Sequence, residues 1–111
     1  MIFIANVIAA LIIMIIFIYV YKEAYGTTVY YFYDENCSNC VRMNPEWQKF
    51  SEGTNFNMIK PIKVDVTDLA NRELADSFGI SAIPTIFKVK DNIRYEYKGV
   101  RTSAEISSWS Q

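Results

Sequence analysis

The first twenty residues carry no charged side chain, although Asp, Glu, Lys and Arg make up 21% of the chain. Within residues 2–20 the one strongly polar side chain is Asn6. A helix of about nineteen residues, rising roughly 1.5 Å per residue, approaches the hydrocarbon thickness of a bilayer. The 111-residue chain therefore divides into an apolar segment long enough to span a membrane and a remainder of mixed polarity.

The end of the apolar segment is typical of a membrane helix. Tyr19 and Tyr21 lie where amphipathic rings favour the headgroup layer, and Lys22 follows directly. We therefore predict an uncleaved transmembrane anchor over residues 1–21 and a short linker over residues 22–26, which holds the following domain close to the membrane surface.

Two alternatives to an anchor are open at this point. A cleaved signal peptide requires a positive start, a shorter apolar core and small residues before the cut, and Lys22, Glu23 and Ala24 fit that pattern poorly. A buried core helix normally shows a polar stripe to water, which this run lacks. Because a single Lys22 beside Glu23 gives no charge asymmetry, the sequence predicts single-pass membrane localisation but not the side on which the rest of the chain lies.

Residues 27–111 have the size of one small domain with one modest core. Basic and acidic residues nearly balance, at 11 and 12, and no basic run or low-complexity tract is present. This composition argues against nucleic acid as a partner. The chain has no histidine, so the commonest general base and metal ligand is missing.

A strand and a helix meet at residue 37. Thr27–Tyr33 is rich in β-branched and aromatic residues, as buried strands are. From Cys37 onward the period becomes helical, and Pro45 lies either inside this helix or near a later start of it. The apolar face of the helix comprises Cys40, Met43, Trp47 and Phe50.

The later elements complete the order β-α-β-α-β-β-α. A loop is expected over residues 51–57, and Thr102 and Glu105 have capping-box spacing before a terminal helix. Between this loop and the terminal helix, we predict a strand over 60–67, a helix over 68–78 and two hairpin strands over 85–90 and 93–98.

Three local sequence features support the predicted helix over 68–78 and the predicted hairpin. Leu69, Leu74 and Phe78 are the residues that the second helix offers to the core, and Gly79 ends that helix. The dipeptide at positions 91 and 92, Asp-Asn, tolerates the left-handed conformations of a tight hairpin.

Cys37 and Cys40 form the motif C-S-N-C at the predicted helix start. Unpaired helix N–H groups and the positive end of the helix dipole stabilise a thiolate there, which favours Cys37 as the nucleophile and Cys40 as the resolving thiol. Structural zinc requires four ligands, so two cysteines would suffice only if two chains shared the site. A purely structural disulfide is a further alternative, but it would close a very small loop and stabilise the fold little.

The chain resembles the thioredoxin superfamily, and most closely a single protein disulfide isomerase domain. The resemblance rests on the strand TVYYFY before C-S-N-C, on Pro45, on GISAIPT over residues 79–85 and on YKGVR over residues 97–101. It covers nearly all of residues 27–111 and implies a trimmed thioredoxin-like α/β fold after one transmembrane helix.

By position, the resemblance implies that Cys37 is the nucleophile, Cys40 the resolving cysteine and Pro84 a cis-proline facing them. Ile83 would then offer its backbone to a substrate strand. An ordinary trans proline that begins a strand is the alternative for Pro84. A cis X–Pro bond is uncommon, so an Ile-Pro-Thr sequence at this place favours the cis form.

The chain also departs from the family pattern. Asn36 stands where the family usually has Trp before the first cysteine, and Tyr31 stands where it usually has a buried acid. The first strand and helix of a full thioredoxin are missing, with the membrane helix in their place.

These features predict a membrane-anchored oxidoreductase that exchanges disulfides with protein substrates and needs no metal or organic cofactor. The alternative from a different class is a redox-silent binding module that holds an extended peptide against Pro84. The direction of exchange, the specific substrates and the oligomeric state are not encoded in any motif of the sequence.

Overall fold

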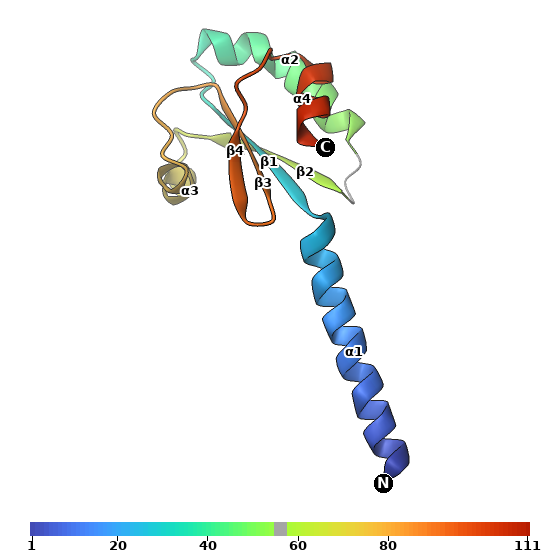
Figure 1. The fold of residues 1–111 in the computed structure, drawn as a ribbon. Coiled ribbons are helices and arrows are strands. Elements are labelled where there is room, and N and C mark those ends of the chain that lie inside the picture. The colour runs from blue at the N-terminus through green and yellow to red at the C-terminus, as the bar shows by residue number, and fades with distance from the viewer. Residues whose placement is uncertain (55–57) are drawn as a thin grey trace.

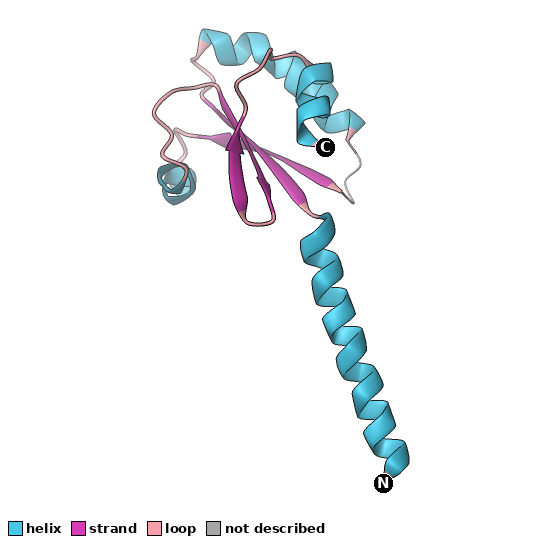
Figure 2. Cartoon of the chain, in the orientation of Figure 1, coloured by secondary structure: helices cyan, strands magenta, loops and turns pink. Residues whose placement is uncertain are grey.

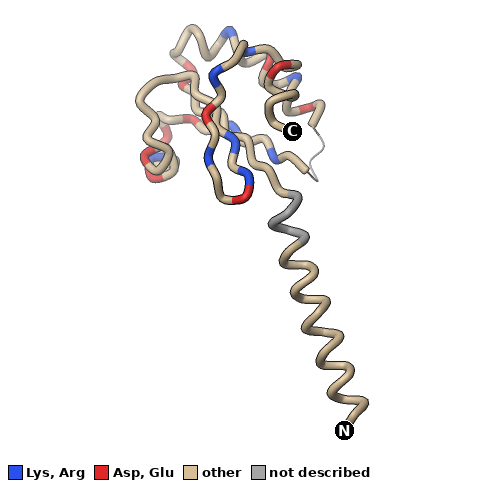
Figure 3. Tube along the Cα trace, in the orientation of Figure 1, with Lys and Arg blue, Asp and Glu red and all other residues tan. Residues whose placement is uncertain are grey.

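The computed structural model describes residues 1–54 and 58–111, with the backbone alone over residues 21–25. Helix α1, Ile2–Tyr25, projects from a small globular part (Figure 1). No helix breaker occurs before Gly26, so the helix continues through most of the segment expected as a linker and passes into strand β1 after one residue. The tube of α1 carries no charged residue over Ile2–Val20, whereas both signs mix over the rest of the chain (Figure 3).

The globular part is built on a four-stranded sheet of order β2-β1-β3-β4. Strand β1, Thr27–Tyr33, pairs in parallel with β2, Ile59–Asp65, and antiparallel with β3, Thr85–Lys90. Strand β4, Ile93–Glu96, forms a hairpin with β3. The predicted first strand is confirmed, and Asp91 and Asn92 have the positive φ values, 54° and 63°, that the tight hairpin requires.

Helices cover both faces of the sheet (Figure 2). Helix α2, Ser38–Gly53, and helix α4, Ser103–Ser110, lie together on one face, and α3, Arg72–Ser77, lies on the other. The resulting order β-α-β-α-β-β-α of an α/β fold is the one that the sequence predicts.

The larger of two apolar clusters lies between the sheet and the pair α2 and α4. Its buried members are Val29, Tyr31, Met43, Trp47, Phe50, Ile59, Ile86 and Ile106. The apolar face predicted for α2 is therefore confirmed, because Cys40, Met43, Trp47 and Phe50 are all buried. Pro45 lies inside α2, which begins at Ser38 and continues through Gly53, three residues into the segment expected as a loop. Residues 55–57 of that segment lie outside the described part.

The predicted helical segment over 68–78 is observed over residues 69–77, but in two parts. A 3₁₀ turn, Leu69–Asn71, precedes α3, and the Asp68 carboxylate accepts a hydrogen bond from the Ala70 N–H at 3.0 Å. The turn changes the helical phase, so Leu69, expected in the core, is 74% exposed. Leu74 and Phe78 pack against the second cluster as expected, and Gly79 follows the helix with φ +63°.

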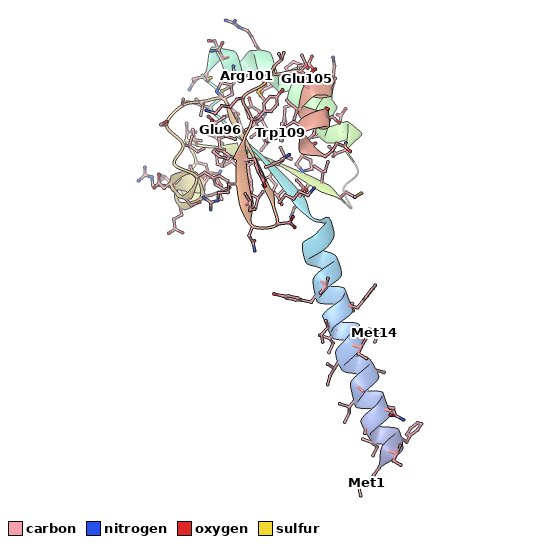
Figure 4. All side chains as sticks on the ribbon, in the orientation of Figure 1. Met1, Met14, Glu96, Arg101, Glu105 and Trp109 are labelled. Atoms are coloured by element: carbon pink, nitrogen blue, oxygen red, sulfur yellow. The ribbon has the colours of Figure 1, made fainter. Side chains whose placement is uncertain are left out.

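Helix α4 begins as the capping pattern predicts. The Thr102 hydroxyl accepts a hydrogen bond from the Glu105 N–H at 3.3 Å. Ile106 is fully buried, and the Trp109 ring lies 4.9 Å from the Tyr97 ring, centroid to centroid, on the sheet side of the helix (Figure 4).

Candidate active site

Cys37 is the N-cap of α2, at the end of β1 that lies furthest from α1 (Figure 1). Its Sγ accepts a hydrogen bond from the backbone N–H of Cys40 at 3.2 Å. A turn positions it: the Asp34 carbonyl accepts from the Cys37 N–H at 3.1 Å, and the Asp34 carboxylate accepts from the Asn36 N–H at 2.9 Å. Cys37 is half-buried.

Cys40 lies one turn further along α2 and is fully buried. Burial raises the pKa of the Cys40 thiol above its ordinary value, and the hydrogen bond with Cys37 adds to this effect. Both cysteines are free thiols in this structure. The two cysteines therefore differ in burial, since Cys37 is half-buried and Cys40 is enclosed.

The loop before β3 brings two further predicted residues to Cys37. The Ile83–Pro84 peptide bond is cis, as the sequence predicts. The Ile83 carbonyl oxygen lies 3.9 Å from the Cys37 Sγ, within the range of a sulfur hydrogen bond, although 46 residues separate them. The structure thus brings together Cys37, Cys40, Ile83 and Pro84.

A cavity of about 310 Å³ opens beside this loop. Ile83, Ile80 and Val66 supply apolar walls, while Arg72 and Asp76 supply one charge of each sign. Apolar walls with a few charged groups are typical of a binding site, and Ile83 joins this cavity to the loop beside Cys37.

Tyr31, in the place of the expected acid, lies directly beneath Cys40. Its hydroxyl donates toward the Cys40 carbonyl at 3.1 Å and toward Asn44 Oδ1 at 2.8 Å. Burial raises the pKa of Tyr31 well above its ordinary value, with the charge of Cys40 as the second cause. The phenol is therefore neutral at any physiological pH.

Sequence reasoning missed Asn44 and two arginines. Asn44 lies four residues after Cys40, one helical turn along the same face, which is a signal that the spacing offers. Arg42 and Arg101 line a cavity of about 230 Å³ with Asn39 and Met43, and Figure 4 shows Arg101 close to α2.

Comparison with known proteins agrees with this geometry. Residues 18–111 match the sequence model of the thioredoxin family. The chain belongs to the thioredoxin family. Its two cysteines occupy the active-site position of thioredoxin-family proteins, as the resemblance of the sequence predicts.

Curated relatives include thioredoxin-related proteins of membranes. Thioredoxin-related transmembrane protein 1 of Bos taurus is 36% identical over 74 residues, which are 67% of this chain and 26% of that protein. Protein disulfide-isomerase TMX3 of Xenopus laevis is 31% identical over 77 residues, which are 68% of this chain and 17% of that protein. The chain thus spans about a quarter or less of the length of these relatives.

Among solved structures, the first thioredoxin domain of mouse protein disulfide-isomerase A4 has the same fold. The TM-score is 0.66 and the identity 31%, over 76% of this chain and 60% of that one. The fold of this chain is therefore that of a thioredoxin domain.

Proposed function

We propose that the protein is a thiol–disulfide oxidoreductase that exchanges disulfides with protein substrates. The observation that carries this proposal is the position of Cys37: its sulfur is held at a helix N-terminus, beside the Ile83 carbonyl, with the buried thiol of Cys40 one turn behind. Family membership and the disulfide isomerase relatives support the same reaction class.

In the reductive direction, the Cys37 thiolate attacks one sulfur of a substrate disulfide. A Cys37–substrate disulfide forms and the second substrate sulfur leaves as a thiolate. The Cys40 sulfur then attacks Cys37 Sγ, and the first substrate sulfur leaves and takes up a proton. The substrate gains two electrons and two protons, and the cysteine pair becomes a disulfide. The reverse sequence oxidises a substrate dithiol.

Ile83 and Pro84 form the substrate-binding part of the site in this proposal. The backbone of an extended peptide would pair with Ile83 next to the Cys37 sulfur, and a flanking side chain would enter the cavity lined by Ile80 and Val66. This arrangement places the scissile disulfide over Cys37.

We further propose that α1 anchors the domain as a single-pass membrane helix. Within the described residues, Ile2–Val20 is the one stretch long and apolar enough to cross a bilayer, and none of it is buried against the rest of the chain. This exposure contradicts the buried-core-helix alternative. Met1 and Met14, for example, are exposed on α1, which extends away from the globular part (Figure 4). In this arrangement residues 27–111 form the catalytic domain, and its active site faces away from the anchor.

A trapping experiment with cysteine variants of the full chain tests the proposed reaction. Cys40→Ser should accumulate mixed disulfides with substrates, because no thiol remains to resolve them, while Cys37→Ser should form none. Trapping by Cys37→Ser and not by Cys40→Ser would reverse the roles. If neither variant traps a protein and dithiothreitol leaves partner binding unchanged, the redox-silent binding module is the correct function instead.

A further inference from the structure

Three polar groups meet beneath the resolving cysteine. The Tyr31 hydroxyl lies 3.1 Å from the Cys40 carbonyl oxygen and 2.8 Å from Asn44 Oδ1. The Tyr31 ring is fully buried, with the Trp47 ring 5.1 Å and the Tyr33 ring 5.4 Å from it, centroid to centroid. Packing on both sides fixes the position of the phenol oxygen, so only its proton is free to turn.

A phenol carries a single donor proton, which makes one full hydrogen bond at a time. With Cys40 in the thiol form, the shorter contact assigns this proton to Asn44. Rotation about the C–O bond redirects it toward Cys40, whose carbonyl oxygen lies 3.1 Å from the phenol oxygen, without any movement of the ring. Burial raises the pKa of the Cys40 thiol, and hydrogen bonding with the Tyr31 side chain acts in the opposite direction.

We propose that Tyr31 donates its hydroxyl proton in a hydrogen bond to the Cys40 sulfur during the resolving step, and that Asn44 accepts this hydrogen bond between turnovers. This inference rests on the proposed oxidoreductase function. The phenol stabilises the attacking thiolate and does not remove its proton.

The step balances without a proton transfer to Tyr31. The Cys40 thiol loses its proton to solvent, its sulfur bonds to Cys37 Sγ, and the bond between Cys37 and the substrate sulfur breaks. The departing substrate thiolate then takes up a proton. The products are the Cys37–Cys40 disulfide and a reduced substrate thiol, with Tyr31 and Asn44 chemically unchanged.

Other charged and titratable groups face this site from several elements. Lys63, on β2, lies over the Tyr33 ring at 4.2 Å and over the Tyr31 ring at 5.9 Å from Nζ to centroid. Cys37 and Tyr33 also act on Tyr31, and the Asp34 backbone acts on Cys40. Asp65 and Glu35 act on Tyr33, and Arg42 and Arg101 line the neighbouring cavity. Helix α4 contributes the apolar Ile106. A Tyr31→Phe change keeps the ring, its packing and the Lys63 contact, and removes only the donor.

The test follows the reaction of the full-length reduced chain, in detergent, with 5,5′-dithiobis(2-nitrobenzoate). Attack by Cys37 releases one thionitrobenzoate, and resolution by Cys40 releases a second, whose rate over a pH series gives the midpoint for Cys40 ionisation. Tyr31→Phe should move this midpoint to higher pH by about one unit and slow the second release about tenfold near neutral pH. Above both midpoints the two rates should converge, because all of the Cys40 is then ionised.

Two further variants sharpen the test. Tyr33→Phe removes a hydroxyl from a half-buried tyrosine on the same strand and should leave the midpoint at its wild-type value. Asn44→Leu removes the competing acceptor at similar volume and should move the midpoint to lower pH, opposite to Tyr31→Phe.

The outcomes separate this inference from the proposed function. A wild-type chain that never releases the second thionitrobenzoate contradicts the oxidoreductase proposal itself. A wild-type chain that releases it, with a midpoint that Tyr31→Phe leaves unchanged or lowers, overturns only the role of Tyr31. Should Tyr31→Phe fail to fold, Asn44→Leu decides alone, because an unchanged or raised midpoint is incompatible with competition for the phenol proton.

Discussion

The carboxylate of Glu46 accepts a hydrogen bond from the backbone N–H of Ser103 at 2.8 Å, across 57 residues of sequence. This contact joins the active-site helix α2 to the first turn of α4, where an N–H group has no partner within its own helix. The same hydrogen bond lowers the pKa of Glu46 below its ordinary value, and Lys49, at 3.8 Å, contributes in the same direction.

The first prediction concerns stability in acid. A carboxyl whose pKa is lowered in the folded state stabilises the fold above its unfolded pKa, about 4.3, and this contribution is lost as the pH falls through the folded value. Glu46→Gln keeps an acceptor but removes the titration, so its melting temperature should fall less steeply between about pH 6 and pH 3. Thermal unfolding of the full chain over this range measures the slopes. Glu52→Gln makes the same change of charge on the same helix without touching the contact with Ser103, and is the matched control.

The second prediction contrasts two aliphatic residues. Ile106 is fully buried between α4 and the sheet, and Leu69 is 74% exposed. Ile106→Ala should lower the free energy of unfolding by about 2–5 kcal/mol, because it removes buried methyl groups and leaves a cavity. Leu69→Ala should change it by less than about 0.5 kcal/mol. Urea unfolding of both variants, followed by tryptophan fluorescence, measures the difference; equal losses would contradict the described position of Leu69.

The wrong prediction that Leu69 lies in the core has a local cause. The helical pattern over 68–78 assumes one continuous phase, but the Asp65 carbonyl accepts a hydrogen bond from the Asn71 side chain at 3.0 Å, and a 3₁₀ turn intervenes. These side-chain contacts compete with the α-helical hydrogen bonds and shift the phase before Arg72. Hydrophobic period alone carries no information about such competition.

Residues of the active site that are close in sequence were predictable from local spacing, whereas those brought together by the fold were not. Cys37 and Cys40 lie three residues apart at a strand–helix junction, so local spacing is enough to predict their roles. Pro84 lies far along the chain, and its place beside Cys37 was predictable only through the family resemblance. Asn44 was missed because its role depends on Tyr31, which lies 13 residues away on a strand that packs beneath the helix.

The third prediction concerns the membrane. Because Ile2–Val20 is uncharged and exposed along its length, the full chain should resist extraction by high salt and alkaline carbonate and yield to detergent. A chain that begins at Gly26 should be recovered in the soluble fraction, folded and redox active. Recovery of the full-length chain in the carbonate supernatant would contradict an anchor. A shortened chain that lacks residues 1–21 would instead support the signal-peptide alternative.

The last prediction concerns the residue at position 31. The phenol of Tyr31 stays neutral because burial raises its pKa, so it accepts a proton from Cys40 poorly. A carboxylate at the same place could accept this proton directly. Tyr31→Glu should therefore resolve mixed disulfides faster than the wild-type chain near neutral pH.

With the donor role of the hydroxyl included, the second thionitrobenzoate release near pH 7 should be slowest with Phe at position 31, intermediate with Tyr and fastest with Glu. The buried carboxylate has a cost, since an unpaired charge away from water destabilises a fold by several kcal/mol. Lys63, whose Nζ lies 5.9 Å from the Tyr31 ring centroid, is the cation that would offset part of it. Circular dichroism of Tyr31→Glu therefore accompanies the kinetics. A variant that folds but resolves no faster than wild type would show that proton removal from Cys40 does not limit resolution.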